Sequence, residues 1–226
     1  MLAARRLQEQ RGEGNEQMTR IVLVRHGQTA WNREVRFRGR TDLELDEIGL
    51  RQAEATGRYL AARWPVAAVY SSPLRRAMQT AEAIARAQGL SAYPLEGLLD
   101  IDFGEWQGLS PDEVAQRYPA LYRAWLEVPH TVRFPGGEGL DDVRSRVVAG
   151  LDEVVARHPR QAVALVSHTV VNRVLLCAVL GLGNEHFWRL RQKTCAVNVF
   201  DAEEDGIFTI ALLNDTCHLQ GIVEER

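Results

Sequence analysis

Two histidines stand at the ends of two apolar segments that lie far apart in the sequence. His26 follows the segment 21–24 after a single arginine, and His168 directly follows the segment 163–167. Short apolar runs of this kind predict buried strands, and parallel sheets bind ligands beyond the carboxyl ends of their strands. We therefore expect both imidazoles in one crevice, where they could carry out nucleophilic or acid–base chemistry.

Basic and polar side chains accompany both histidines. Arg25 and Asn32 flank the first histidine, and Arg75 and Arg76 stand at the start of a predicted helix that follows another strand. The second histidine is expected to begin a helix, whose free N–H groups favour an anion. These groups together predict a phosphate site. Zinc prefers histidine, cysteine and carboxylate ligands in compact spacing, and neighbouring guanidinium groups disfavour a dication, so we expect no metal.

Composition limits the classes of protein to be considered. The chain has 226 residues and a formal net charge of −3, which suits one globular domain and gives no electrostatic case for binding nucleic acid. Its three cysteines form no CxxC pair and indicate reduced, packed thiols in the cytoplasm. The longest apolar run, 174–183, is too short to span a membrane. Residues 1–18 are polar and charged, and we expect a disordered extension before a single domain at 19–226.

Apolar segments with the periods of strands and helices alternate along the chain. This order predicts a three-layer α/β/α fold with a mostly parallel central sheet and an antiparallel edge hairpin. Ser72 is expected to cap a helix that begins at Pro73, and the strand at 194–200 could pair across a homodimer. The expected strands are 20–24, 66–72, 90–97 and 161–167. The expected helices are 46–63, 73–88, 110–118, a long one within 136–159, and 168–181. The expected hairpin is 195–215, turning at Asp205-Gly206.

Six segments resemble, in order, the blocks of the histidine phosphatase superfamily, the phosphoglycerate mutase-like proteins. They are RHGQTAWN, RFRGRTDLELDEIG, SSPLRRAMQTA, DIDFGEWQG, PGGEGLDDVRSRV and VSHTVVNRVLL. The resemblance covers about residues 20–219 and is to the phosphatase branch. It implies the phosphoglycerate mutase-like fold.

The resemblance also implies roles for individual residues. His26 would be the nucleophile that becomes phosphorylated, and Arg25, Asn32, Arg76 and His168 would form the phosphate pocket. The arginine that precedes Arg76 would then be a solvated neighbour. Phosphoryl transfer places charge on the phosphoryl oxygens, so cations and N–H donors can carry most of the catalysis without a metal or another cofactor.

The chain departs from the family pattern at two positions. The family's proton donor is a glutamate in a pattern like L-x-E-x-x-x-G, and Asp100 stands there, one methylene shorter. We favour Asp100 as the acid, with Asp102 and then Glu105 as alternatives. Thr169 follows the second histidine where the family usually has glycine. Its backbone N–H and its hydroxyl could both face phosphate.

Two further residues are candidates for substrate binding. Arg38 stands where a neutral polar residue is more usual in the family; it could meet a second anionic group or face solvent. Glu138 belongs to a loop that closes over the site in the phosphatase branch; the alternative is that it caps the following helix.

The leading prediction is a metal-independent phosphomonoester hydrolase that acts on a small-molecule phosphate ester through a phosphohistidine. The first alternative is a cofactor-dependent phosphoglycerate mutase, although mutases of this fold carry a long insertion before the second histidine that this chain lacks. The second alternative is a phosphate-binding protein with impaired catalysis. We expect no nucleic-acid or membrane partner, and a homodimer is possible.

Overall fold

A six-stranded sheet forms the centre of the protein. The computed structural model describes residues 18–203 and 206–222, and the strand order is β3-β2-β4-β1-β5-β6. The first four strands in this order run parallel, whereas β5 is antiparallel to both β1 and β6. The mostly parallel sheet with an antiparallel edge hairpin is therefore confirmed. The strands are β1 (Thr19–Arg25), β2 (Ala68–Ser71), β3 (Ala92–Pro94), β4 (Ala162–Ser167), β5 (Val197–Ala202) and β6 (Phe208–Asp215).

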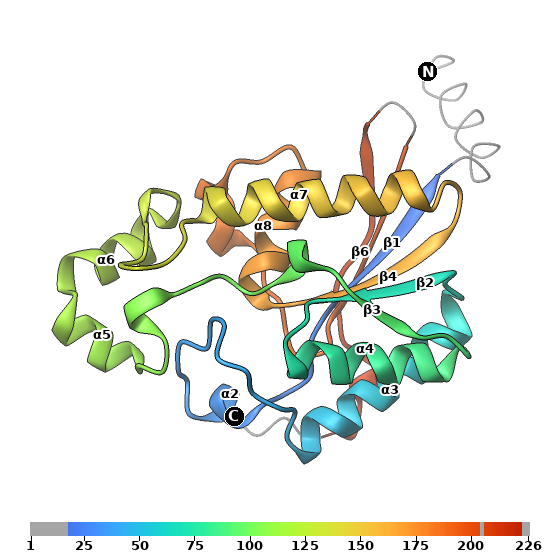
Figure 1. Ribbon diagram of the computed structural model, residues 1–226, viewed down its shortest axis with the longest axis horizontal. Coiled ribbons are helices and arrows are strands. Elements are labelled where there is room, and N and C mark those ends of the chain that lie inside the picture. Colours follow the sequence, from blue (N-terminus) through green and yellow to red (C-terminus); the bar gives the residue numbers. More distant parts are fainter. Residues whose placement is uncertain (1–17, 204–205, 223–226) are drawn as a thin grey trace.

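Helices cover both faces of the sheet (Figure 1). On one face lie α3 (Glu47–Arg63) and α4 (Arg75–Ala87), and on the other lie α7 (Leu140–Arg157) and α8 (Thr169–Val179). The short helices α5 and α6 lie together at one end of the molecule (Figure 1). The remaining helices are α2 (Ala30–Arg33), α5 (Pro111–Arg117), α6 (Pro119–Glu127) and the 3-10 turns η2 (Glu96–Leu98), η3 (Gly104–Trp106), η4 (Pro129–Thr131), η5 (Asn184–Arg189) and η6 (Cys217–Leu219).

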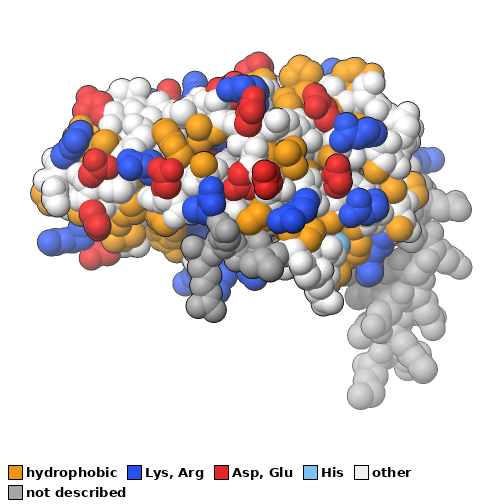
Figure 2. All heavy atoms as spheres, turned by 90° about the horizontal axis from the view of Figure 1, so that it is seen from below, with side chains coloured by type: hydrophobic (Ala, Val, Ile, Leu, Met, Phe, Trp, Pro, Cys, Tyr) orange, Lys and Arg blue, Asp and Glu red, His pale blue; other side chains and the backbone are white. Residues whose placement is uncertain are grey.

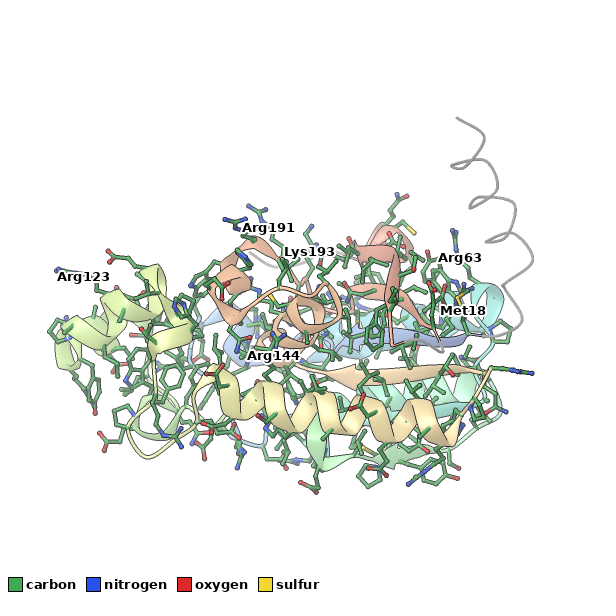
Figure 3. The ribbon with its side chains drawn as sticks, turned by 90° about the horizontal axis from the view of Figure 1, so that it is seen from above. Met18, Arg63, Arg123, Arg144, Arg191 and Lys193 are labelled. Carbon is green, nitrogen blue, oxygen red and sulfur yellow. The ribbon has the colours of Figure 1, made fainter. Side chains whose placement is uncertain are left out.

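The central strands are apolar on both faces because each face contacts a helical layer. In β1, Ile21 and Leu23 join the core beneath α7 and α8, whereas Val22 and Val24 join the core beneath α3 and α4. Alternate residues of a strand point to opposite faces, so one continuous apolar run serves both cores. Arg144 on α7 donates to the carbonyl of Leu182 at 2.9 Å, which ties α7 to the loop after α8 (Figure 3).

Most predicted helix ends are confirmed, and one is wrong. Asp46 caps α3, and Ser110 caps α5 with Pro111 at its first position. Ser72, however, does not cap α4, which begins at Arg75. The N–H of Ser72 instead donates to the carbonyl of Val166 at 2.9 Å and so continues the pairing of β2 with β4. The hydrogen bonding to β4 therefore extends to Ser72, one residue beyond the end of β2, and the helix starts later than predicted.

The strand suggested for a dimer contact, 194–200, overlaps β5, which lies inside the sheet. β5 has hydrogen-bonded neighbours on both sides, β1 and β6, so it cannot pair with a second chain. The helix α6 was not predicted. Cys177 and Cys195 are buried as expected, whereas Cys217 is exposed.

The outer surface mixes charges of both signs. On the face shown in Figure 2, basic and acidic side chains are interspersed among hydrophobic ones. Within the described ranges, no helix combines the length and the apolar character needed to cross a bilayer. The extension predicted at 1–18 and the hairpin tip at Asp205 lie outside the described residues, apart from Met18.

Candidate active site

The register of two neighbouring strands brings the two histidines together. β1 and β4 are parallel, and Arg25 is aligned with Ser167, so the residue after each is a histidine. The N–H of His26 donates to the carbonyl of Ser167 at 2.9 Å. The ring centroids of His26 and His168 lie 5.1 Å apart, and both side chains are fully buried. The expected juxtaposition at the carboxyl ends of the strands is therefore present.

The imidazole of His26 is held in one tautomer. Its Nδ1 lies 2.6 Å from the carbonyl oxygen of Gly27, and a carbonyl can only accept, so Nδ1 carries the proton. Nε2 is buried and has no hydrogen-bond partner among the residues that the structure describes. Burial, followed by the charges of Arg76 and Arg25, lowers the pKa of His26 well below its ordinary value of 6.5. The ring is thus neutral at physiological pH, with the Nε2 lone pair free to attack.

The backbone beside His26 requires glycine. A Cβ placed on Gly27 would lie 2.6 Å from the carbonyl oxygen of Gly49, and one on Gly49 would lie within the backbone of Gln28. This close approach seats the start of α3 directly against the loop that carries His26. The glycine of the Arg-His-Gly motif therefore has a steric role.

His168 lies at the N-cap of α8, as predicted. Its Nε2 is 2.8 Å from the hydroxyl of Ser72, and its Nδ1 is 3.5 Å from a carboxylate oxygen of Asp100. Burial, then the charge of Arg76, lowers the pKa of His168 well below 6.5. A second neutral imidazole therefore lies beside the first, at a helix N-terminus that favours anions.

Three guanidinium groups surround the histidines. Arg25 donates to the carbonyl of Gln192 at 2.7 Å, and burial lowers its pKa to about 9, so it stays charged at neutral pH. Arg76 is fully buried and donates to the carbonyls of Gly39 and Thr41. Burial lowers the pKa of Arg38 to about 10. Arg75, by contrast, is exposed and paired with acidic side chains at the surface, as expected for a solvated neighbour.

Asp100 is the acidic side chain that faces the histidines. Its Oδ2 accepts from Arg76 Nη2 at 3.0 Å, and burial raises its pKa above 3.8 against the opposing charges of Arg76 and Arg38. Asp102 instead accepts from the N–H of Gly104 and lies 3.8 Å from Arg40. Geometry therefore favours Asp100 over the alternative at position 102.

The third acidic candidate, Glu105, lies farther from the histidines. It accepts from the hydroxyl of Tyr118 at 2.6 Å, on the side of the loop next to α5.

Glu138 does not line the pocket. Its carboxylate accepts from Arg146 at 3.1 Å and from Arg40 at 3.1 Å, and it also accepts from the N–H of Asp102. Arg146 in turn donates to the carbonyls of the loop that carries Asp100, including that of Asp100 itself at 3.1 Å. Gly139 is the N-cap of α7, so Glu138 does not cap that helix. Its contacts hold the acidic loop in place.

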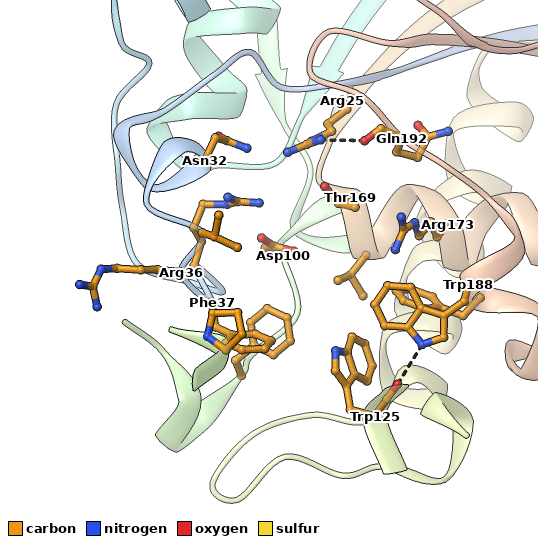
Figure 4. A pocket seen from close by; sticks show the side chains of 16 residues that line it. Arg25, Asn32, Arg36, Phe37, Asp100, Trp125, Thr169, Arg173, Trp188 and Gln192 are labelled. Atoms are coloured by element: carbon orange, nitrogen blue, oxygen red, sulfur yellow. Dashed lines mark hydrogen bonds between the residues drawn. The ribbon is translucent and has the colours of Figure 1, made fainter. Parts of the chain in front are cut away.

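A cavity of about 370 Å³ adjoins this group and is lined by three of its members, Arg25, Arg38 and Asp100 (Figure 4). Asn32 accepts from the N–H and the hydroxyl of Thr29, both at 2.9 Å, which leaves its NH₂ group as a donor toward the cavity. Thr169 lines the cavity from the first turn of α8, and its buried hydroxyl has no partner in the described part of the chain. The remaining lining residues are Arg25, Val35, Arg36, Phe37, Arg38, Asp100, Phe103, Pro111, Trp125, Val170, Arg173, Phe187, Trp188 and Gln192.

Three of the residues around the site were not identified from the sequence. Ser72 contacts His168, Gln192 holds Arg25, and Arg173 lines the cavity from α8. The signal for Arg173 was available, since it lies four residues after Thr169 and must share its helix face. No local pattern singles out Ser72 or Gln192, because their contacts depend on tertiary packing.

Comparisons with known proteins agree with this geometry. Residues 21–216 match the histidine phosphatase superfamily (branch 1). Phosphoserine phosphatase 1 of Hydrogenobacter thermophilus is 40% identical over 202 residues, which cover 89% of this chain and 95% of that protein. The wheat (Triticum aestivum) 2-carboxy-D-arabinitol-1-phosphatase is 35% identical over 183 residues, covering 80% of this chain and 37% of the wheat protein.

The same similarity is found among solved structures. The structure of a mycobacterial glucosyl-3-phosphoglycerate phosphatase superimposes with a TM-score of 0.81 and 30% sequence identity, covering 88% of this chain and 100% of that one. The family match spans most of the chain, and these relatives are phosphatases. The chain therefore belongs to the histidine phosphatase superfamily and is a phosphatase.

Proposed function

We propose that the enzyme hydrolyses small phosphate monoesters through a phosphohistidine on His26 and needs no metal. The observation that carries the proposal is the tautomer of His26, since the Gly27 carbonyl fixes the proton on Nδ1 and leaves the Nε2 lone pair available. A cavity of about 370 Å³ suits a small-molecule substrate.

The first step forms a bond from Nε2 of His26 to phosphorus and breaks the bond from phosphorus to the ester oxygen. The departing oxygen takes a proton from Asp100, whose raised pKa favours the protonated acid. In the second step water attacks phosphorus, Asp100 takes a proton from the water, and the P–N bond breaks.

Donors around His26 stabilise the charge on the phosphoryl oxygens. Arg25, Arg76, Asn32 and His168 supply these contacts, together with the N–H and hydroxyl of Thr169. Several of these groups have buried polar atoms with no partner among the described residues, which a phosphoryl group would satisfy: Arg25 Nε, Arg76 Nε, His168 Nδ1 and Thr169 Oγ1.

A mutase receives less support. The interval between the FGEWQG block and α7 holds only the short helices α5 and α6 and the turn η4. No longer segment is present there to shield a phosphohistidine from water, so hydrolysis is favoured over transfer.

Turnover of p-nitrophenyl phosphate with and without EDTA tests the proposal, together with ³²P labelling of the protein. We expect undiminished turnover in EDTA and an acid-labile label that is lost in His26→Ala. Loss of activity in EDTA, restored by a metal, would contradict the metal-free mechanism. Absence of any turnover would favour the alternative of a phosphate-binding protein with impaired catalysis. Formation of 2-phosphoglycerate from 3-phosphoglycerate, without release of inorganic phosphate, would identify a mutase.

A further inference from the structure

Four arginines line the cavity, and two of them, Arg25 and Arg36, already have an anionic partner or an assigned role. The four are Arg25, Arg36, Arg38 and Arg173. Arg36 is neutralised by Glu34 at 2.9 Å and lies 3.5 Å from Glu113. Arg25 lies beside the nucleophile and is assigned to the phosphoryl group. Asp100 is the one acidic residue in the described lining, so the cavity carries an excess of positive charge.

Arg38 also belongs with the phosphoryl group. Its charge lowers the pKa of His26 and of His168, and it interacts with Asp100. Arg38 lines the same cavity, and its Nη1 donates to the carbonyl of Trp31 at 3.4 Å, next to Asn32, so its charge adds to the field that binds the transferred phosphate. Only Arg173 is then left without an anion to bind.

Arg173 is built into the wall of the cavity as a cation. It makes no hydrogen bond or ion pair with the described residues, and its Nε is buried. Its guanidinium carbon lies 5.1 Å from the ring centroid of Phe187 and 5.0 Å from that of Trp188. These two rings from η5 hold the guanidinium by cation–π contact, which leaves its N–H groups available to a ligand (Figure 4).

The location of Arg173 defines the ligand it can reach. It follows Thr169 by one turn of α8, a rise of about 5–6 Å, so it faces the same cavity beyond the phosphoryl position. We propose that Arg173 binds a carboxylate on the substrate, and that the enzyme selects phosphate esters carrying a carboxylate a few bonds from the ester oxygen. This inference rests on the proposed function, since it places the substrate's phosphate on His26.

A carboxylate fits this position better than a neutral group. The planar guanidinium can donate two parallel hydrogen bonds to it, and the aromatic seat fixes the plane of the guanidinium before binding. The three relatives described above are named for phosphoserine, 2-carboxy-D-arabinitol 1-phosphate and glucosyl-3-phosphoglycerate. Each of these molecules carries a carboxylate near its phosphate ester.

Matched pairs of substrates test the inference. The first pair is O-phosphoserine and O-phosphoethanolamine, and the second is 3-phosphoglycerate and glycerol 3-phosphate; members of each pair differ chiefly in the carboxylate. The wild-type enzyme, Arg173→Gln, Arg173→Lys and the control Arg36→Gln are assayed on both pairs and on p-nitrophenyl phosphate. Thermal unfolding shows that each variant is folded.

We expect wild type to prefer the carboxylated member of each pair. Arg173→Gln should lower kcat/KM for that member by about 10- to 100-fold, mainly through KM, and should leave phosphoethanolamine and p-nitrophenyl phosphate almost unchanged. Arg173→Lys should recover part of the preference, because it keeps the charge but loses the planar fork. Arg36→Gln should keep the wild-type ratio.

Two results would overturn the inference while leaving the hydrolase intact. One is a carboxylate preference that is the same in wild type and Arg173→Gln. The other is an equal loss on all three kinds of ester, which would show that Arg173 only braces the wall. A wild-type enzyme inactive on every ester would instead overturn the proposed function, and this inference with it.

Discussion

The floor and the rim of the cavity are built in different ways. The floor is the buried group of Arg25, His26, Arg76, Asp100 and His168, of which Arg25 and Asp100 line the cavity. Each is at most 8% exposed and is fixed at a strand end, a helix start or a clamped loop. The rim consists of Phe37, Trp125, Phe187 and Trp188, whose rings come from a loop, α6 and η5. Trp188 is 42% exposed and donates to the carbonyl of Trp125 at 2.8 Å (Figure 4).

This contrast separates chemistry from selection. The floor is tied to the sheet, so its geometry changes little without changing the fold, and it can be shared by enzymes with different substrates. The rim is attached to short segments outside the sheet. Trp125 and Phe187 are buried in the hydrophobic core, whereas Trp188 is exposed and can be substituted at little cost in stability. We therefore expect floor variants to lose turnover on every ester, and rim variants to change which ester is preferred.

The largest loss should follow removal of the proposed nucleophile, His26. His26→Ala should lower kcat by at least about 10⁴-fold on every ester, because no other described side chain in the floor offers an unprotonated lone pair in a fixed tautomer. Steady-state phosphate release measures this loss, and thermal unfolding confirms that the variant is folded.

The matched control is His130→Ala, which removes an exposed imidazole outside the cavity. Its turnover should equal that of wild type. Near-normal phosphate release by folded His26→Ala would place the nucleophile elsewhere.

Removal of the proposed acid, Asp100, should cause the next largest loss, and only for poor leaving groups. Asp100→Asn should lower kcat/KM on alkyl phosphates by about 10²–10⁴-fold, because an alkoxide must be protonated as it leaves. The loss on p-nitrophenyl phosphate should be much smaller, since p-nitrophenolate leaves without a proton.

Asp102→Asn is the control, because its carboxylate serves a turn and an ion pair with Arg40. If the dependence on the leaving group appeared in Asp102→Asn and not in Asp100→Asn, the acid would be Asp102.

The floor could be predicted from the sequence because its residues lie at places that patterns mark. A buried strand ends at a definite residue, and the two strands that deliver His26 and His168 are both continuous apolar runs. Once these strands pair in parallel with Arg25 opposite Ser167, the residues that follow, His26 and His168, lie side by side. The predicted cap at Ser72 is wrong because the hydrogen bonding of β2 to β4 extends one residue beyond the strand, to Ser72. The hydroxyl of Ser72 instead contacts His168.

The rim could not be predicted in the same way. Trp125 and Trp188 are separated by 63 residues, and their contact depends on how α6 folds back on η5. Glu138 shows the same limit, since its ion pairs with Arg40 and Arg146 join three segments whose spacing carries no signal. Arg173 is the exception, because helical spacing from Thr169 would have placed it.

The third prediction concerns the affinity of the floor for phosphate. Arg76→Gln should raise the inhibition constants of vanadate and inorganic phosphate, and should lower kcat by about 10²–10³-fold, as for loss of a charged donor to the transition state. Glutamine keeps part of the contact to the carbonyls of Gly39 and Thr41. Trp188→Ala, a rim variant, should leave vanadate inhibition unchanged. Equal inhibition of Arg76→Gln and wild type would contradict the assigned pocket.

The smallest effect should appear in stability rather than rate, and it distinguishes floor from rim without any substrate. Burial lowers the pKa of His26 and of His168 below 6.5. Below pH 6.5 these two histidines are therefore protonated in the unfolded chain while they remain neutral in the folded chain. Their contribution to stability is present above pH 6.5 and is lost as pH falls below it, at no more than about 1.4 kcal/mol per pH unit for each group. Burial raises the pKa of Asp100, so its contribution has the opposite sign: it is present at low pH and is lost as pH rises through the folded pKa.

Urea unfolding between pH 4.5 and 7.5 measures these opposed contributions. In His168→Asn the free energy of unfolding should depend less steeply on pH below 6.5 than in wild type. Asparagine does not titrate, so the difference in proton binding between the unfolded and folded chains is smaller by one histidine. In Asp100→Asn it should rise more steeply with pH, because the opposing contribution is removed. Trp188→Ala carries no ionisable change and should shift the curve without altering its slope. If the slope in His168→Asn equalled that of wild type, His168 would have the same pKa in the folded and the unfolded chain. Burial in the floor would then not lower the pKa of this histidine.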